Sequence, residues 1–393
     1  MHRSPAATCA DGRSGDCGMI ASLSAYRPSQ DELAREQRLL NDEQWQGERQ
    51  WLSEFLPRVN RARTGEELFA AHVSLVARLR ARQDHIVKLR ERSTELASRR
   101  SGLARIYPKP IRELRDVQAE LTEVDWDAFV HRALYWLSLD LGDALAWRSL
   151  GFDRAAISVL GMGDRVAWLS SGRGWDAEIA AINELSNTGT YGLLNDATTC
   201  LRLGDITCFF EDRVEIREVK AGRMVPDEDP QQVRLHNAVT LINEHHGVVE
   251  GAPSAIVRCS KPFETYLGQL PGILGRARSH GSHVEQISRS QVVLARDFAN
   301  SAQKPFNDDD VRALAGWPPS DIVMDWGTSL RRMRDRRLKP AYLAPLALLP
   351  LQVEDVTDLL LGQLDYSCWV NVSSVARVLR PRSRRGAIWP AGV

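Results

Sequence analysis

An apolar pattern with helical spacing runs unbroken from Thr64 to Gly102 and constrains the fold more than any other feature of the sequence. Thr64 followed by Glu67 makes a capping box, which is typical of a helix N-terminus. The sequence therefore predicts one long helix from residue 64 to about residue 102.

Further helical patterns flank this segment on both sides. A second capping box, Ser29 with Glu32, predicts a helix that Pro57 closes. Residues 111 to 150 are again helical in pattern, after a break at two nearby prolines. The helices before Pro57 and after Thr64 could form a hairpin or coiled-coil arm that serves self-association or partner proteins, or could pack on the rest of their own chain. Residues 1–27, rich in Ser, Gly, Ala and Arg, are expected to form a flexible tail, and residues 28–150 a helical N-terminal region.

Composition favours an ordinary soluble protein of two or three domains. Of the 393 residues, 43% are hydrophobic and 26% charged, which excludes fibrous, disordered and membrane classes. No apolar run is long enough to cross a bilayer, and the N-terminus lacks the apolar centre of a signal peptide. The expected location is the cytoplasm, with no membrane partner.

The charge balance decides where a nucleic acid could bind. The formal net charge is zero, so any such binding must use local positive patches. The positive residues are nearly all arginine, and lysine occurs only at positions 88, 109, 220, 261, 304 and 339. A lysine within a motif is therefore a rare event in this chain.

From about Ala156 the pattern changes to that of an α/β region, assigned to residues 151–262. Residues 157–161 and 165–170 are expected to be short strands, and residues 175–185 a helix. A strand at 198–203, the strand GDITCFF (204–210), the strand VEIREVK (214–220), a helix from Gln231 to about Glu244 and the strand SAIVRCS (254–260) follow. Residues 263–393 are predicted to be mostly helical, with no legible role.

The hairpin at 204–220 carries the residues with chemical potential. Asp205 begins one strand, and the turn at 211–213 returns the chain so that Glu218 lies beside it. Because side chains alternate along a strand, Glu218 and Lys220 share a face while Val219 faces the opposite side. Phosphodiester hydrolysis needs carboxylates to hold a divalent cation and a positive group near the attacking water, which these residues could supply.

An acidic residue, a hairpin and a (D/E)xK triplet resemble the PD-(D/E)XK nuclease superfamily, and the order of elements resembles its restriction-endonuclease-like αβββαβ core. The resemblance implies that Asp205 and Glu218 bind Mg²⁺ or Mn²⁺, that the Val219 carbonyl joins them, and that Lys220 positions or activates water. It further implies a helix glutamate and a helix glutamine, for which Glu178 and Gln231 are preferred over Glu184 and Gln232. Gly204 stands where the superfamily name has proline.

The expected function is thus metal-dependent hydrolysis of phosphodiester bonds, DNA more than RNA because most of the superfamily acts on DNA. Restriction, phage-defence and repair nucleases share this core. Two alternatives stay open: a catalytically inactive nucleic-acid-binding module, and a helical scaffold protein whose long arm is its working part.

Overall fold

A computed structural model describes residues 30–162, 168–219, 230–249, 251–256, 266–298, 308–327 and 345–379. It is a mixed α/β protein that is mostly helical and carries small antiparallel sheets. This agrees with the predicted α/β class. The predicted flexible tail, residues 1–27, lies outside the described residues. None of the described helices is both long and apolar enough to cross a membrane.

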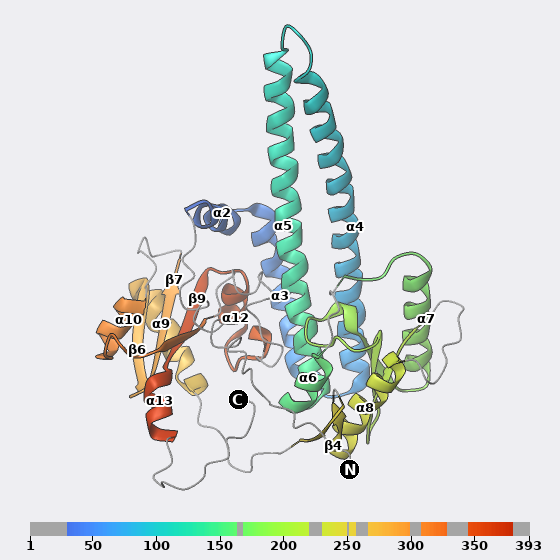
Figure 1. The fold of residues 1–393 in the computed structure, drawn as a ribbon, viewed down its shortest axis with the longest axis vertical. Helices are drawn as coiled ribbons and strands as arrows, with labels where there is room; N and C mark the ends of the chain where they lie inside the picture. The colour runs from blue at the N-terminus through green and yellow to red at the C-terminus, as the bar shows by residue number, and fades with distance from the viewer. Residues whose placement is uncertain are drawn as a thin grey trace, which may run out of the picture.

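The N-terminal region is helical, as expected, but its helices pair differently. Helices α4 (Gly65–Leu103) and α5 (Ile111–Ser149) run antiparallel and form a long arm that projects from the body (Figure 1). The capping box of Thr64 and Glu67 is present at the start of α4. The arm is therefore a hairpin of the second and third predicted helices, and the expectation that the first two form it is wrong.

The segment before the arm is two helices, α2 (Gln30–Leu40) and α3 (Glu43–Arg61). The Asp42 carboxylate accepts hydrogen bonds from the backbone N–H groups of Gln44 and Trp45 and so starts the second helix. Pro57 lies inside α3 and does not end it, because the buried residues on either side of the proline hold the last turn in the core.

The candidate region contains the expected order of helix, three strands, helix and strand. Strands β1 (Tyr191–Leu194), β2 (Ile206–Phe209) and β3 (Val214–Arg217) form one antiparallel sheet between helices α7 (Arg173–Asn187) and α8 (Pro230–Glu244). Strand β4 (His246–Val249) does not join them. It pairs with β5 (Ala252–Ala255), because the chain reverses at Gly251, whose φ is +80°. The strand predicted at 254–260 overlaps only the end of β5, and residues 257–260 lie outside the described residues. A restriction-endonuclease-like core is thus not confirmed.

Two of the predicted strands are wrong. Residues 157–161 belong to a short helix, α6 (Arg154–Leu160), which Asp153 caps. A short buried apolar run fits a helix or a strand equally well, and here the cap decides. The strand expected at 198–203 is irregular, and the sheet begins earlier, at Tyr191. Of residues 165–170, the described part, 168–170, forms no strand.

The C-terminal region contains a sheet that the sequence patterns do not predict. Its described residues form a four-stranded antiparallel sheet in the order β6-β7-β9-β8. Its strands are β6 (Ser282–Ser288), β7 (Gln291–Asp297), β8 (Val323–Gly327) and β9 (Leu364–Asn371), with helices α9 (Leu270–His280), α10 (Asp308–Ala315), α12 (Val353–Leu360) and α13 (Val372–Leu379) around them. Runs such as VVLA in β7 are buried along their whole length, so they lack the alternation that identifies a strand.

The last described elements return to the first ones. The indole N–H of Trp45 in α3 donates a hydrogen bond to the Leu361 carbonyl just after α12, at 2.9 Å. Arg49 forms an ion pair with the nearly buried Asp358 at 2.6 Å. Figure 1 shows α12 beside α3, so the two ends of the described chain share one core.

The buried His72 on α4 connects the arm to β1. Its Nε2 accepts a hydrogen bond from the Leu194 N–H at 3.2 Å, and burial lowers the pKa of His72 from 6.5 to about 3. The folded protein therefore keeps this ring neutral at pH 5, whereas the unfolded chain protonates it below about pH 6.5. Stability from this group is complete above pH 6.5 and is lost as the pH falls towards 3.

We expect the free energy of unfolding to fall by about 2 kcal/mol from this group between pH 7 and pH 5. Denaturant unfolding at both pH values measures it. A His72→Gln variant, whose amide oxygen can still accept from Leu194, should show a pH dependence smaller by about that amount. Equal pH dependence in the two proteins would contradict the assignment.

Candidate active site

The β2–β3 hairpin brings Asp205 beside the residues that follow β3. The ladder pairs Ile206 with Arg217, and the Asp205 N–H extends it by donating to the Arg217 carbonyl at 2.8 Å. Gly204 enters this strand with a φ of +70°, and a Cβ there would lie 2.4 Å from the Ile216 side chain. The missing proline of the superfamily pattern therefore has a local reason, because proline cannot adopt a positive φ.

The Asp205 carboxylate is held at the end of β3. Its Oδ2 accepts a hydrogen bond from the Val219 N–H at 2.6 Å, and the residue is only 5% exposed. The Val219 side chain packs against the main core. An ionised carboxylate can accept about four hydrogen bonds, so this bond does not by itself exclude a bound cation.

Glu218 is joined to the helix that follows the hairpin. The Gln231 side-chain amide, in the first turn of α8, donates to Glu218 Oε2 at 2.9 Å. The structure thus links four of the residues that the sequence singled out in two pairs, Asp205 with Val219 and Glu218 with Gln231. Their catalytic roles stay predictions.

Two further residues of the predicted site, Glu178 and Lys220, are not part of these two pairs. Glu178 lies on α7, is 4% exposed and accepts a hydrogen bond from the Ser170 hydroxyl at 2.8 Å. Glu184, the other candidate on that helix, is exposed. Through this hydrogen bond, Glu178 contacts the segment before α7. Its role in the active site stays a prediction. Lys220 lies outside the described residues.

The donor set fits a hard divalent cation by its chemistry. Two carboxylates and the Val219 carbonyl are oxygen ligands, which Mg²⁺ and Mn²⁺ prefer, and water would complete the shell. Within the described part of the chain, no three His, Cys, Asp or Glu side chains gather as a metal-binding group. Among the described residues, Asp205 and Glu218 are the carboxylates through which the predicted site would bind a metal.

A buried polar network that sequence reasoning missed positions Asp205. The Asn195 amide donates to the carbonyls of Leu203 and Gly204, at 2.5 and 3.2 Å, and its oxygen accepts from the Thr207 hydroxyl at 2.7 Å. The Asn195 N–H donates to the Asp205 carbonyl at 2.9 Å. The signal in the sequence is the polar run NDATT inside an apolar stretch. The predicted strand at 198–203 includes only its last two residues.

Asp143 of α5 secures the next part of this loop. Its carboxylate accepts hydrogen bonds from the N–H groups of Thr199 and Cys200, at 2.6 and 2.9 Å, and from the Thr199 hydroxyl at 2.5 Å. Asp143 is 1% exposed. The base of the arm therefore fixes the loop from which the candidate hairpin starts.

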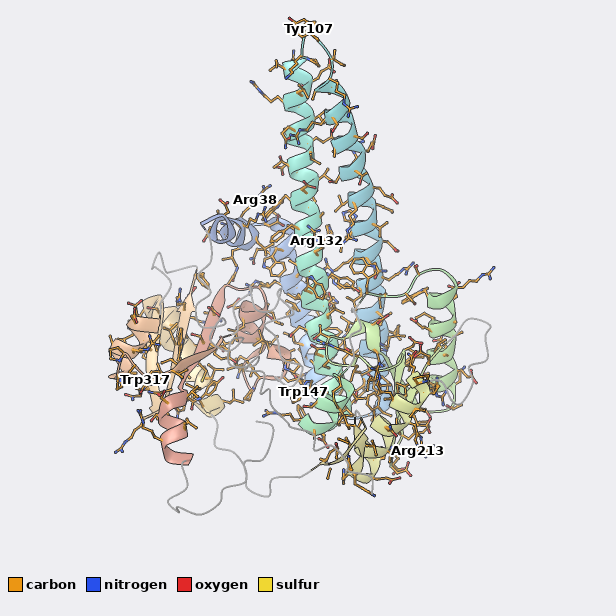
Figure 2. All side chains as sticks on the ribbon, viewed as in Figure 1. Arg38, Tyr107, Arg132, Trp147, Arg213 and Trp317 are labelled. Atoms are coloured by element: carbon orange, nitrogen blue, oxygen red, sulfur yellow. The ribbon has the colours of Figure 1, made fainter. Side chains whose placement is uncertain are left out.

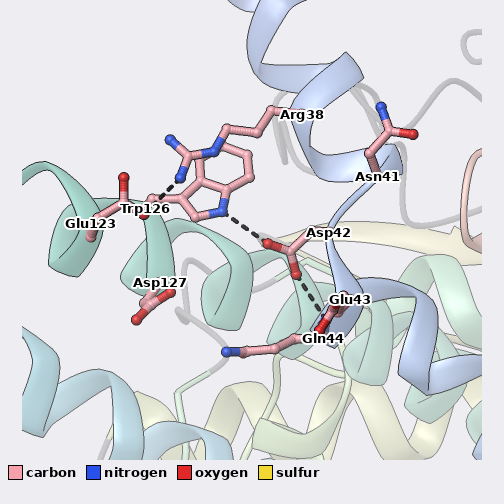
Figure 3. A pocket seen from close by; sticks show the side chains of 8 residues that line it. All are labelled: Arg38, Asn41, Asp42, Glu43, Gln44, Glu123, Trp126 and Asp127. Atoms are coloured by element: carbon pink, nitrogen blue, oxygen red, sulfur yellow. Dashed lines mark hydrogen bonds and ion pairs between the residues drawn. The ribbon is translucent and has the colours of Figure 1, made fainter.

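A separate polar hollow of about 550 Å³ lies where α2 and α3 meet the shaft of the arm (Figure 3). Arg38 lies over the Trp126 ring at 4.0 Å and pairs with Glu123 at 2.9 Å, while the Trp126 N–H donates to Asp42 at 2.9 Å. Burial, with the nearby Asp42 and Glu123 carboxylates, raises the pKa of Asp127 in its wall. These contacts fix the bend between α2 and α3 against α5.

No family model, no curated protein and no solved structure matches this chain.

Proposed function

We propose that this protein is a metal-dependent nuclease that hydrolyses phosphodiester bonds, with DNA preferred over RNA, and that its active site lies at the β2–β3 hairpin. The observation that carries the proposal is the pair of hydrogen bonds at the end of β3. The Val219 N–H binds the Asp205 carboxylate and the Gln231 amide binds the Glu218 carboxylate, so each acidic side chain has a described partner in or just after the segment that follows β3.

Each residue has a distinct task in this proposal. Asp205 and Glu218 would hold the cation through carboxylate oxygens, and the Val219 carbonyl would add a third ligand. Gln231 would orient Glu218 by the hydrogen bond already described. A divalent cation bound there would lower the pKa of the attacking water and polarise the phosphate.

Lys220 would complete the site with positive charge. It follows Val219 directly in the sequence, two positions after Glu218 and three after the end of β3. Its ammonium group would stabilise the charge that develops on the phosphate oxygens or hold the attacking water. The order of elements around the hairpin supports the same assignment, whereas the separate β4–β5 pair does not contribute to it.

The test is cleavage of linear, supercoiled and single-stranded DNA, and of RNA, in Mg²⁺, Mn²⁺ or EDTA. We expect cleavage that needs the metal and that a Lys220→Ala variant loses by about a hundredfold or more, the usual contribution of a residue that transfers or positions a proton. A Lys261→Ala variant, which removes a lysine without an acidic residue two positions before it, is the matched control.

Three outcomes separate the alternatives. Unchanged cleavage in the Lys220→Ala variant would contradict the site. Binding of nucleic acid by both proteins without any cleavage would favour a catalytically inactive binding module. Absence of both cleavage and binding, with a protein that self-associates without metal, would favour the helical scaffold.

A further inference from the structure

The far end of the arm carries a concentration of positive charge in a protein of zero net charge. We call residues 99–115 the arm tip: the last turn of α4, the connecting loop and the first turn of α5. The arm tip contains six basic residues and one acidic residue, Glu113. All six basic side chains are exposed, at positions Arg99, Arg100, Arg105, Lys109, Arg112 and Arg115.

These charges are not explained by the ion pairs of the arm. Lower on the arm, Arg92 pairs with Glu95 and Glu120. None of the six basic side chains of the arm tip forms an ion pair with a residue that the structure describes. Arg112 stands in the first turn of α5, where a positive charge opposes the helix macrodipole and so weakens the helix slightly. Arg100, in the last turn of α4, is favourable to the dipole of that helix, so helix stability accounts for part of the cluster but not for Arg112.

The arm tip also exposes apolar side chains. Tyr107 is 95% exposed, and Ile106 and Ile111 are 51% and 60% exposed. Figure 2 shows Tyr107 at the extreme end of the arm, farthest from the body. The small core of the outer arm, formed by Leu96, Val117 and Leu121, does not include them. An exposed aromatic ring among arginines is the combination that binds unpaired bases and their phosphates.

Below the tip, the α5 side of the shaft has the opposite charge. Residues 116–127 of α5 contain five acidic residues and no basic one. A polyanion would be repelled from this side of the arm, which favours contact at the end. A 39-residue helix is about 58 Å long, which keeps that contact away from the hairpin site at the base.

We propose that the arm tip is a second nucleic-acid-binding site, which takes single-stranded nucleic acid, with the six cations on the phosphates and Tyr107 stacked on a base. The exposed ring favours a single strand over a duplex, because a duplex hides its base faces except at its ends. An anionic membrane could also attract basic and apolar groups; the choice of a nucleic acid over a membrane rests on the proposed nuclease function.

The experiment measures binding of the full-length protein to a labelled single-stranded oligonucleotide and to the matching duplex in EDTA, so that cleavage plays no part. An Arg105→Gln, Lys109→Gln, Arg112→Gln variant should bind the single strand at least about tenfold more weakly. The slope of its log affinity against log salt should be less steep by about 2, because three charges are removed and each phosphate contact on a single strand contributes about 0.7.

A matched variant controls for net charge. Arg35→Gln, Lys88→Gln, Arg289→Gln removes three exposed positive charges from α2, the shaft of α4 and the β6–β7 turn, and leaves the arm tip intact. It should bind like the unaltered protein. Tyr107→Phe should retain binding, whereas Tyr107→Leu should lose about tenfold, because leucine keeps the apolar surface but cannot stack.

Several results would overturn the inference. Equal losses in the arm-tip and matched variants would mean that the effect is one of net charge. Binding of phosphatidylserine vesicles through the arm tip, with no loss of oligonucleotide binding in the variants, would assign the tip to a membrane. Metal-dependent cleavage by Lys220→Ala tests the hairpin site, whereas binding by the arm-tip variant in EDTA tests the tip, so a failure of the nuclease proposal and a failure at the arm tip are separate results.

Discussion

A Gly142→Ala variant is expected to lose several kcal/mol of unfolding free energy, the largest stability effect of any single methyl group that the structure suggests. Gly142 lies on α5 where the loop of Ala197 crosses the helix. An added Cβ would stand 1.8 Å from the Ala197 carbonyl oxygen and 2.9 Å from its carbon. Both contacts are with backbone, so the helix and the loop must separate.

The control for this prediction is Gly47→Ala in α3, where nothing lies within 4 Å of the new Cβ. Alanine exceeds glycine in helix propensity by about 1 kcal/mol, so the control should be stabilised while Gly142→Ala is destabilised. Urea unfolding of both variants measures the two values. A stabilised Gly142→Ala protein would show that α5 and the loop are farther apart than described.

An Asp205→Asn variant is expected to lose metal-dependent cleavage by about a thousandfold or more. Asparagine can still accept the Val219 hydrogen bond through its side-chain oxygen, so the hairpin should be retained, but the negative charge that would hold the cation is gone. Loss of a charge-stabilising cation is worth several kcal/mol in the transition state, and each 1.36 kcal/mol is about tenfold in rate. Calorimetric titration with Mn²⁺ should show weaker binding in parallel.

Two glutamates on α7 give this test its controls. Glu184→Gln changes an exposed carboxylate and should cleave like the unaltered protein. Glu178→Gln changes the buried carboxylate beside Ser170, and a loss of cleavage there would add it to the site. If Asp205→Asn cuts and binds Mn²⁺ like the unaltered protein, the hairpin is not the metal site.

The helices of the arm could be predicted from sequence because their signals are local. The Thr64 capping box, the apolar period after it and the two prolines before Ile111 all lie within the elements that they define. Which helices pair could not be predicted, because α4 and α5 have nearly the same pattern as any long amphipathic helix. Their partner is decided by the loop length and by burial across the whole core.

The strands were harder to predict, for two physical reasons. In α6, a run of apolar residues has the composition of a buried strand, and only Asp153 at its start distinguishes it as a helix. In β7, burial on both faces removes the alternation of polar and apolar residues, so the C-terminal sheet was missed. The pairing of β4 with β5 depends on the backbone at Gly251.

In the candidate site, too, the contacts that are local along the chain could be predicted and the distant ones could not. The meeting of Asp205 with the end of β3 follows from the length of the hairpin turn, which the sequence contains. The Gln231 contact also follows from the chain order, since α8 begins soon after the hairpin. The support from Asp143 could not be found this way, because it joins residues of a loop to a helix 56 positions earlier.

The contact between α3 and the segment after α12 has a consequence for synthesis of the chain. Trp45 and Leu361 are separated by 316 positions, so the hydrogen bond of the α3 indole can form only after nearly the whole polypeptide has been synthesised. Such distant pairings carry a large loop-closure cost and slow folding. Helices α4 and α5 can cover part of α3 early in synthesis, but the surface around Trp45 stays uncovered until α12 and Leu361 have left the ribosome.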